Sequence, residues 1–249
     1  MPSAPTAPAT LSRQLRRLGL TRSADDLNDL LARAANGRWT PVALLEALAT
    51  TELEDRAHRS LERRFKPMAD FEWSWPKALD RPLVEQVLTL DFLGRAENLV
   101  LVGAQGLGKT MIAKNTVHQA ILHGHSALFT TAADLLLDLN GQETARALDR
   151  RLKHYCRLQL LAIDEIGYLA YDAHAADLLF QIVSRRYEQK SIVLTTNLAF
   201  RNWHTIFPNA SCAVGWIDRL THHAAIVKIT GDSYRLREAE HAQKTRRAS

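Results

Sequence analysis

The stretch that decides the fold reads Gly103-Ala104-Gln105-Gly106-Leu107-Gly108-Lys109-Thr110. It follows the apolar run Leu99–Val102 and precedes a helical stretch that begins at Met111. The pattern matches G-x-x-x-x-G-K-[ST], in which glycines let successive backbone N–H groups face a phosphate and the next helix offers its positive end. An ordinary glycine turn is the alternative interpretation, but the strand before it and the helix after it favour a phosphate loop. We therefore expect Gly103 to Met111 to bind ATP, with Lys109 on the β- and γ-phosphates and Thr110 on Mg²⁺.

Two further apolar runs end in polar side chains that suit phosphoryl chemistry. Leu160-Leu161-Ala162-Ile163 is followed by Asp164, which is placed to hold the magnesium shell, and by Glu165, which is placed to polarise the attacking water. One strand later, Ile192-Val193-Leu194-Thr195-Thr196 is followed by Asn197. We expect Asn197 to orient that water, and the alternative is an ordinary turn residue.

Short aliphatic runs alternate with helical stretches over the second part of the chain. This alternation predicts an α/β fold whose five-stranded parallel sheet is covered by helices on both faces. The predicted strands are Leu99–Val102, Ala127–Thr130, Leu158–Ile163, Ile192–Thr195 and Ala225–Ile229.

The first part of the chain predicts a small helical domain. Ser23 is expected to cap one helix that ends at Asn36-Gly37, and Thr40-Pro41 is expected to begin another that runs towards Arg64. The stretch after it, rich in proline and aromatic residues, is interpreted as a linker. The predicted divisions are a disordered tail over 1–10, the helical domain over 11–66, the linker over 67–82, the nucleotide-binding domain over 83–237 and a basic tail over 238–249.

Composition excludes several classes of protein. The 249 residues hold two cysteines, Cys156 and Cys212, and neither has a second cysteine at metal spacing. This argues against a disulfide scaffold or a zinc site and fits the cytoplasm. The N-terminus lacks the order of a signal peptide, and no apolar run approaches the roughly 20 residues that cross a bilayer. The net charge of +5 favours a polyanionic partner, though only weakly by itself.

An arginine and two histidines lie late in the sequence. Arg219 is expected near the carboxyl edge of the sheet at a subunit boundary, where it would neutralise charge on the γ-phosphate of a neighbouring subunit. The alternative is a surface pair with Asp218 that contributes little. His222 and His223 have no companions at metal-ligand spacing, and we interpret them as packing or surface residues.

Two rows of basic residues recur at helical spacing. The first row shares one helix face, while Leu148, Leu152 and Tyr155 share another, and it spans roughly 16 Å at 1.5 Å per residue. Such a row either follows the phosphates of a nucleic acid or is a solvated face, and no motif for reading bases is visible, so binding to duplex DNA is expected to be independent of sequence. The first row consists of Arg146, Arg150, Lys153 and Arg157. The second row consists of Arg56, Arg59, Arg63 and Lys66.

Taken in order, these motifs resemble those of the IstB-like AAA+ ATPases of insertion sequences and of the related DnaC-type helicase loaders. The resemblance covers most of the chain from about Asp70 to Arg237 and, loosely, the helical N-terminus, and five stretches favour the IstB side. They are Thr131–Leu136, Ile163–Leu169, Leu179–Tyr187, Asp218–Ala224 and Ser233–Arg237. The resemblance implies an ATP-dependent homo-oligomer on duplex DNA that engages a partner transposase, with ATP sites at subunit interfaces. By position, it implies that Lys109 and Thr110 bind nucleotide and magnesium and that Asp164 and Glu165 form the Walker B pair. It also implies that Asn197 is the first sensor and that Arg219 acts in trans as an arginine finger.

One common AAA+ feature departs from the pattern. About twenty residues follow the last predicted strand, too few for the helical lid that carries a second sensor arginine, so we expect no C-terminal lid domain. Arg235 either substitutes for that sensor or is structural. Three functions therefore stay open, namely a transposition helper ATPase, a helicase loader and a nucleotide-gated scaffold with weak turnover. The stretches Phe180–Tyr187 and Thr221–Ala224 favour the first.

Overall fold

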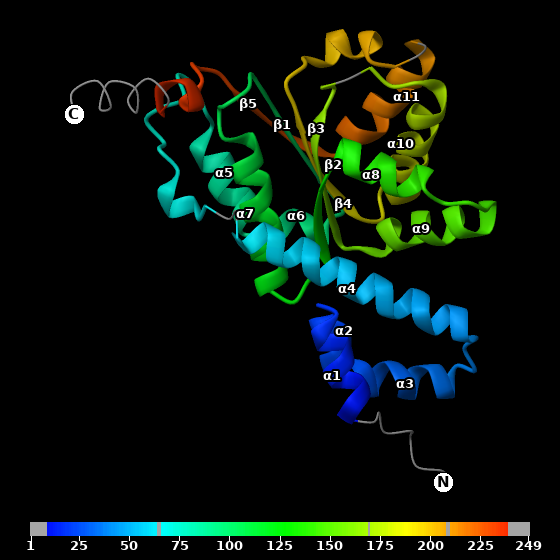
Figure 1. Cartoon of the computed structure of the whole chain (residues 1–249). Coiled ribbons are helices and arrows are strands. Elements are labelled where there is room, and N and C mark those ends of the chain that lie inside the picture. The colour runs from blue at the N-terminus through cyan, green and yellow to red at the C-terminus, as the bar shows by residue number, and fades with distance from the viewer. Residues whose placement is uncertain (1–8, 64–65, 169, 208–209, 239–249) are drawn as a thin grey trace. The chain divides into compact units, whose positions relative to one another are not determined.

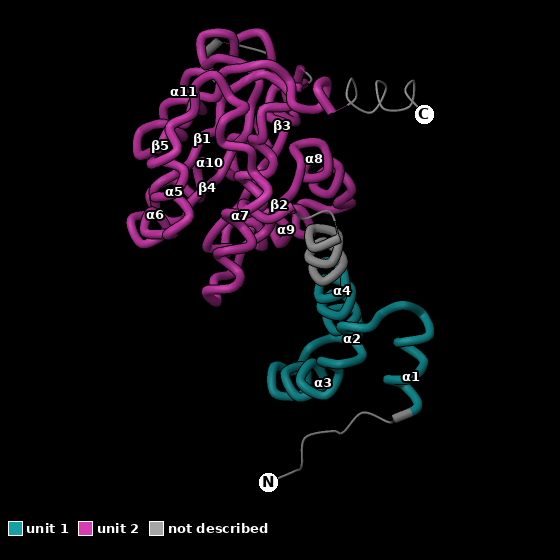
Figure 2. The backbone as a smooth tube through the Cα atoms, turned by 90° about the vertical axis from the view of Figure 1, so that its left-hand side faces the viewer, with its two compact units in different colours: residues 1–64 teal, residues 65–249 magenta. Residues whose placement is uncertain are grey.

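The computed structural model describes residues 9–63, 66–168, 170–207 and 210–238, without the side chains of residues 9, 54–63 and 210–212. The chain divides into two compact units, residues 1–64 and 65–249 (Figure 2). Most of the predicted terminal tails, residues 1–8 and 239–249, lie outside the described residues, and a helix already begins at Ala9. Among the described residues, no helix is long and apolar enough to span a membrane.

The first unit is helical, as the sequence predicts. Leu15, Ala24 and Leu27 form its small apolar core. The last helix begins where expected, because the Thr40 hydroxyl accepts a hydrogen bond from the Ala43 N–H at 3.2 Å. The helices are α1 (Ala9–Arg17), α2 (Thr21–Asp25), α3 (Leu27–Asn36) and α4 (Pro41–Arg63).

Ser23 does not cap a helix, so that prediction was wrong. The expected single helix breaks at Asp26 into α2 and α3, and Ser23 lies buried inside α2. Its hydroxyl donates to the Leu48 carbonyl at 2.9 Å, and its N–H donates to Glu52 Oε2 at 3.3 Å. The first-turn N–H has no partner within its own helix, so the carboxylate of α4 satisfies it and joins the two helices.

The second unit is built on a parallel five-stranded sheet, which confirms the predicted fold class. Its strand order is β2-β3-β4-β1-β5 (Figure 1). The predicted strand positions are confirmed to within two or three residues at each end. The strands are β1 (Asn98–Gly103), β2 (Ala127–Thr131), β3 (Leu160–Ile166), β4 (Ser191–Thr196) and β5 (Ala224–Ile229).

Helices cover both faces of this sheet. In Figure 1, α5 and α7 lie on one side, and α8 to α11 lie on the other. The central strands are therefore buried on both faces, and their sequences are continuously apolar rather than alternating. The helices are α5 (Arg81–Leu88), α6 (Asp91–Gly94), α7 (Lys109–Leu122), α8 (Ala132–Asn140), α9 (Ala145–Arg157), α10 (Ala173–Arg186) and α11 (Ala210–Thr221), with short 3₁₀ turns η1 (Met68–Asp70) and η2 (Phe200–Thr205).

The stretch over 67–82, predicted to be a linker, packs on the second unit instead. Phe71 is buried, and Ala78 forms an antiparallel bridge with Thr230. The Trp75 indole N–H donates to the Asp232 carbonyl at 2.8 Å. Its aromatic residues suggested an irregular connection, but they provide the apolar surface that holds this segment against the sheet domain.

Candidate active site

The phosphate-loop sequence connects β1 to α7 at the carboxyl edge of the sheet. Gly106 and Gly108 adopt φ values of +77° and +88°, which favour glycine. Space also requires glycine: a Cβ on Gly106 would collide with the Ser233 hydroxyl, and one on Gly108 would lie 2.5 Å from the Phe71 ring. No side chain caps the first turn of α7, so its N–H groups are left for an anionic ligand.

Lys109 is buried and folds back across this loop. Its Nζ donates to the carbonyl oxygens of Gly103 and Ala104, each at 2.7 Å. Burial lowers the pKa of Lys109, the nearby Asp164 opposes that shift, and Arg235 adds to it. The ammonium thus lies within electrostatic range of Asp164 and of Arg235.

The segment after β5 reaches the same loop. Residues 234–238 form a helical turn, and the Tyr234 N–H donates to the Gly106 carbonyl at 3.0 Å. Arg237 anchors this turn through an ion pair with Glu72 at 3.0 Å and lies 4.5 Å over the Trp75 ring. These contacts place Arg235, whose role the sequence left open, beside the phosphate loop.

Asp164 is buried at the end of β3 and accepts hydrogen bonds from two threonines. Thr110 Oγ1 donates to Asp164 Oδ1 at 3.2 Å, and Thr195 Oγ1 donates to the same oxygen at 2.5 Å. Two adjacent ligands of an octahedral Mg²⁺ lie about 2.9 Å apart when each bond is about 2.05 Å. The oxygens of Thr110 and Asp164 therefore fit a magnesium ion in both chemistry and spacing.

Sequence reasoning missed the part played by Thr195. Besides donating to Asp164, its hydroxyl accepts a hydrogen bond from the Glu165 N–H at 3.0 Å. One buried side chain of β4 thus fixes both carboxylate residues of β3. The signal was present, because two threonines end β4 after an aliphatic run, but the pairing of β3 with β4 was needed to interpret it.

Glu165 projects to solvent from an irregular point of its strand. The register between β3 and β4 shifts between Ile163 and Ile166, and Glu165 adopts a φ of +64°. A non-glycine residue in this region costs of order 1 kcal/mol, and a bulge redirects side chains locally. This backbone conformation directs Glu165 away from the sheet, while its neighbour Asp164 stays buried. Asn197 is exposed directly after β4, at the same edge.

Arg219 lies at the opposite edge of the sheet, so its predicted position near the carboxyl edge was wrong. It is in the last turn of α11, just before β5, and the neighbouring Leu220 carbonyl accepts a hydrogen bond at 3.0 Å from Asn98, the first residue of β1. In a parallel α/β fold each helix returns the chain to the amino edge, so the end of α11 lies there. The length of β1, roughly 16 Å at 3.3 Å per residue, separates Arg219 from the phosphate loop of its own chain.

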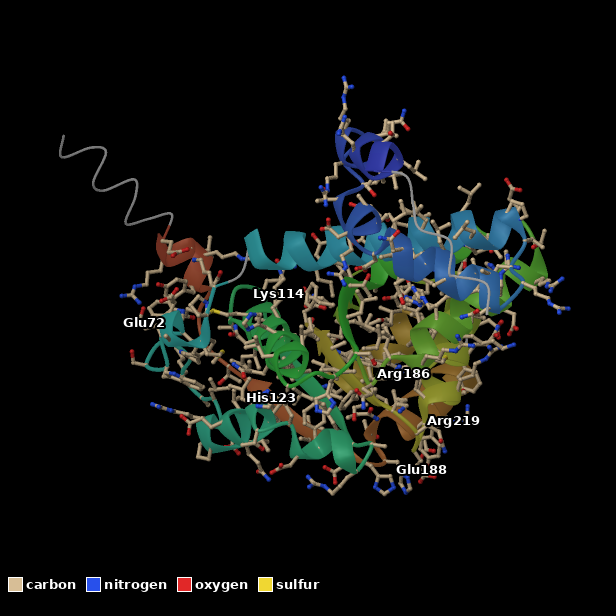
Figure 3. The ribbon with its side chains drawn as sticks, turned by 90° about the horizontal axis from the view of Figure 1, so that it is seen from below. Glu72, Lys114, His123, Arg186, Glu188 and Arg219 are labelled. Carbon is tan, nitrogen blue, oxygen red and sulfur yellow. The ribbon has the colours of Figure 1, made fainter. Side chains whose placement is uncertain are left out.

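Two side chains of α10 hold the Arg219 guanidinium. Its Nη1 donates to Ser184 Oγ at 2.6 Å, and its Cζ lies 4.6 Å above the centre of the Phe180 ring. Figure 3 shows Arg219 at this end of the molecule with Glu188, away from Lys114 of α7. The alternative interpretation, a surface pair with Asp218, is not among the ion pairs of the described residues.

The first basic row has the predicted arrangement on α9. Its four members are exposed, while Leu152 and Tyr155 on the other face are buried. Lys153 forms an ion pair with Asp149 at 2.7 Å, which in turn contacts Arg185 at 3.1 Å. Of the second row, Arg56, Arg59 and Arg63 fall in the part of α4 whose side chains lie outside the described residues.

Comparison with known proteins identifies the family. Residues 13–242 match the model of the IstB-like ATP-binding proteins. The ATP-binding protein of insertion sequence IS5376 of Geobacillus stearothermophilus is 37% identical over 89% of this chain and 92% of its own length. The corresponding proteins of IS232 of Bacillus thuringiensis subsp. berliner and of IS21 of Pseudomonas aeruginosa are 33% and 32% identical, each over 92% of this chain, and over 94% and 89% of their own lengths.

Solved structures support the fold. A crystal structure of DnaI, 18% identical, covers 70% of this chain and 92% of its own with a TM-score of 0.56. The replication initiator DnaA, bound to AMPPCP and single-stranded DNA, is 17% identical and covers 67% of this chain and 50% of its own with a TM-score of 0.55. The chain therefore belongs to the family of IstB-like ATP-binding proteins, and it is an ATPase with the AAA+ fold.

Proposed function

We propose that this chain is a helper ATPase of DNA transposition, which assembles on duplex DNA and engages a partner transposase. The observation that carries the chemistry is the cluster of Thr110, Asp164, Thr195 and Glu165 beside the phosphate loop. The role in transposition is supported by the ATP-binding proteins of three insertion sequences, which are 32–37% identical to this chain over about nine-tenths of its length.

Each residue of the cluster takes one part in hydrolysis. Gly103 to Met111 cradle the phosphates, and Lys109 exchanges its two carbonyl partners for phosphate oxygens when ATP binds. Thr110 and Asp164 hold Mg²⁺, which when bound neutralises charge on the β- and γ-phosphates. Glu165 accepts a proton from the attacking water, and Asn197 orients that water.

Thr195 positions these groups without touching the nucleotide. Its hydrogen bond fixes the rotamer of Asp164, and its contact with the Glu165 N–H holds the strained turn that presents the base. Arg235, near Lys109, supplies a further cation at the phosphates in place of a lid arginine.

The remaining cation comes from a neighbouring subunit. Arg219 is too far from the nucleotide of its own chain, so it acts only where the amino edge of one subunit meets the carboxyl edge of the next. Such an arrangement makes hydrolysis depend on a homo-oligomer. The α9 row supplies the duplex surface, and the avidity of an ATP-assembled array strengthens many weak phosphate contacts.

The partner is the point to test. A Glu165→Gln chain that retains ATP is mixed in turn with the transposase from the adjacent reading frame and with the replicative ring helicase, each with and without duplex DNA. ATP-dependent binding to the transposase is the expected result. Binding to the helicase alone would replace the proposal with a helicase loader, and binding to neither partner would favour the scaffold hypothesis.

A further inference from the structure

Three side chains with metal-binding atoms meet at the amino edge of the sheet, on the opposite side from the nucleotide. Glu188 follows α10, and His222 and His223 connect α11 to β5. One potential ligand atom from each lies within 4.8 Å of the other two. His222 and His223 seemed without companions in the sequence because Glu188 lies 34 residues earlier, and only the fold brings it close.

The two distances from Glu188 to the histidines match those between ligands of a single small cation. Glu188 Oε1 lies 3.3 Å from His223 Nε2 and 3.7 Å from His222 Nδ1, and the two imidazole centres are 4.0 Å apart. Ligands of a tetrahedral Zn²⁺ with bonds of about 2.05 Å are separated by about 3.4 Å. Small rotations of exposed side chains would thus complete three protein ligands, with water as the fourth.

We propose that Glu188, His222 and His223 form a binding site for a transition-metal cation of the Zn²⁺ class. Two imidazoles and one carboxylate suit Zn²⁺, Ni²⁺ or Cu²⁺ and do not suit Mg²⁺, which prefers an all-oxygen shell. The site is thereby chemically distinct from the magnesium ligands Thr110 and Asp164. It also differs from the nucleotide site in being half exposed, with side-chain exposures of 50–52%.

The surroundings show what metal binding must displace. The Tyr187 hydroxyl forms a hydrogen bond of 2.7 Å with His222 Nδ1, and its ring stacks on His222 with centroids 5.9 Å apart. A cation on that nitrogen replaces the hydrogen bond but leaves the stacking intact. Glu188 itself adopts a φ of +55°, so the backbone holds its carboxylate here against a conformational cost.

A cation at this site would tie the end of α10 to the turn between α11 and β5. Arg219 is three residues before His222 and is held by Ser184 and Phe180 of α10. The bound metal would therefore join the same two helices that position Arg219.

The test is Zn²⁺ binding to the full chain without a histidine tag. A chromophoric chelator competes for Zn²⁺ in excess Mg²⁺ and without nucleotide, and thermal unfolding is followed with and without Zn²⁺. We expect one Zn²⁺ per chain that excess Mg²⁺ does not displace, and a rise in Tm on Zn²⁺ addition. His222→Ala/His223→Ala should weaken binding by about tenfold or more and remove the rise in Tm.

Control variants distinguish loss of this site from loss of other histidines or of the fold. His123→Ala/His174→Ala removes two exposed histidines elsewhere and should bind Zn²⁺ as the unaltered chain does. Glu188→Gln should weaken binding, and Tyr187→Phe, which removes the competing hydrogen bond, should bind at least as tightly. Far-ultraviolet circular dichroism with a chelator checks that each variant is folded. Equal Zn²⁺ affinity of folded His222→Ala/His223→Ala and the control, or displacement by Mg²⁺, would overturn the proposal.

Discussion

The two edges of the sheet differ in what they offer a nucleotide. At the carboxyl edge, buried and partly buried contacts bring Lys109, Asp164, Thr195 and Glu165 together around one phosphate loop. At the amino edge, Arg219 lies on a half-exposed surface with Ser184 and Phe180 and faces no nucleotide of its own chain. The carboxyl edge is thus a nearly complete nucleotide site, while the amino edge presents the Arg219 guanidinium with no nucleotide site beside it in the same chain.

This difference indicates where assembly acts. Under the proposed function, binding of ATP would need only contacts that one subunit already makes, whereas hydrolysis would need a cation from a second subunit. We therefore expect substitutions at the two edges to separate affinity for ATP from turnover.

The largest effect is expected from Arg219→Ala. If the arginine completes a neighbouring site, the variant should bind ATP normally while turnover falls by about 10³–10⁵, the range for arginine fingers. Arg185→Ala, which removes a neighbouring α10 arginine that is paired with Asp149 of α9, is the control and should hydrolyse nearly normally. Turnover of mixtures with Lys109→Ala subunits checks the geometry, because each variant then supplies the edge that the other lacks. Normal hydrolysis by Arg219→Ala would remove the functional contrast between the edges.

Glu165→Gln tests the carboxyl edge alone. The amide keeps the shape but loses the base, so we expect ATP to bind and turnover to fall by about 10²–10⁴. Lys109→Ala should instead weaken ATP binding itself, because a charge-assisted contact to phosphate is lost. Nucleotide titration and steady-state turnover distinguish the two outcomes. A Glu165→Gln chain with normal turnover would contradict the assignment of the base.

A smaller effect is expected from Thr195→Val. This change leaves the partly buried Glu165 N–H without its partner and Asp164 with one hydrogen bond fewer, at a cost of about 1–3 kcal/mol in unfolding free energy. Turnover should fall by about tenfold, since the misplacement affects two carboxylates at once. Thr196→Val, the next residue of the same strand, is the control, because its hydroxyl contacts only the Leu198 N–H among the described hydrogen bonds. Equal turnover of the two variants would show that Thr195 only packs.

The smallest effect is expected from the α9 row, which takes no part in the contacts around the phosphate loop or around Arg219. Reversing Arg150 and Lys153 to Glu should weaken binding to unrelated duplexes alike, and each lost contact should lower the log–log salt slope by about 0.9. ATP binding by the isolated chain should be unchanged. Filter binding at several salt concentrations measures both, and the same reversal of Arg59 and Arg63 tests the second row independently. Unchanged affinity and slope in both variants would mean that the rows are solvated faces.

The sequence predicted what is local and strongly patterned. The glycine-rich loop, the five strands and the position of Asp164 follow from motifs that span a few residues, and the structure has them there. Arg219 was predicted at the wrong edge of the sheet. It ends a helix that leads directly into a parallel strand, and such a helix end lies at the amino edge. Thr195 and Glu188 could not be assigned, since their partners lie 31 and 34 residues away and only the folded chain brings them together.

Because Tyr234 contacts Gly106, the phosphate loop is completed only late in synthesis of the chain. The loop at 103–110 leaves the ribosome long before the turn at 234–238 that supports it. At 5–20 residues per second, the roughly 130 residues between them take about 7–26 s to translate. During that interval the growing chain has the loop without Arg235 and without the hydrogen bond from Tyr234. A nascent chain should therefore hold ATP weakly, and it would acquire full affinity only as the last part of the domain is made.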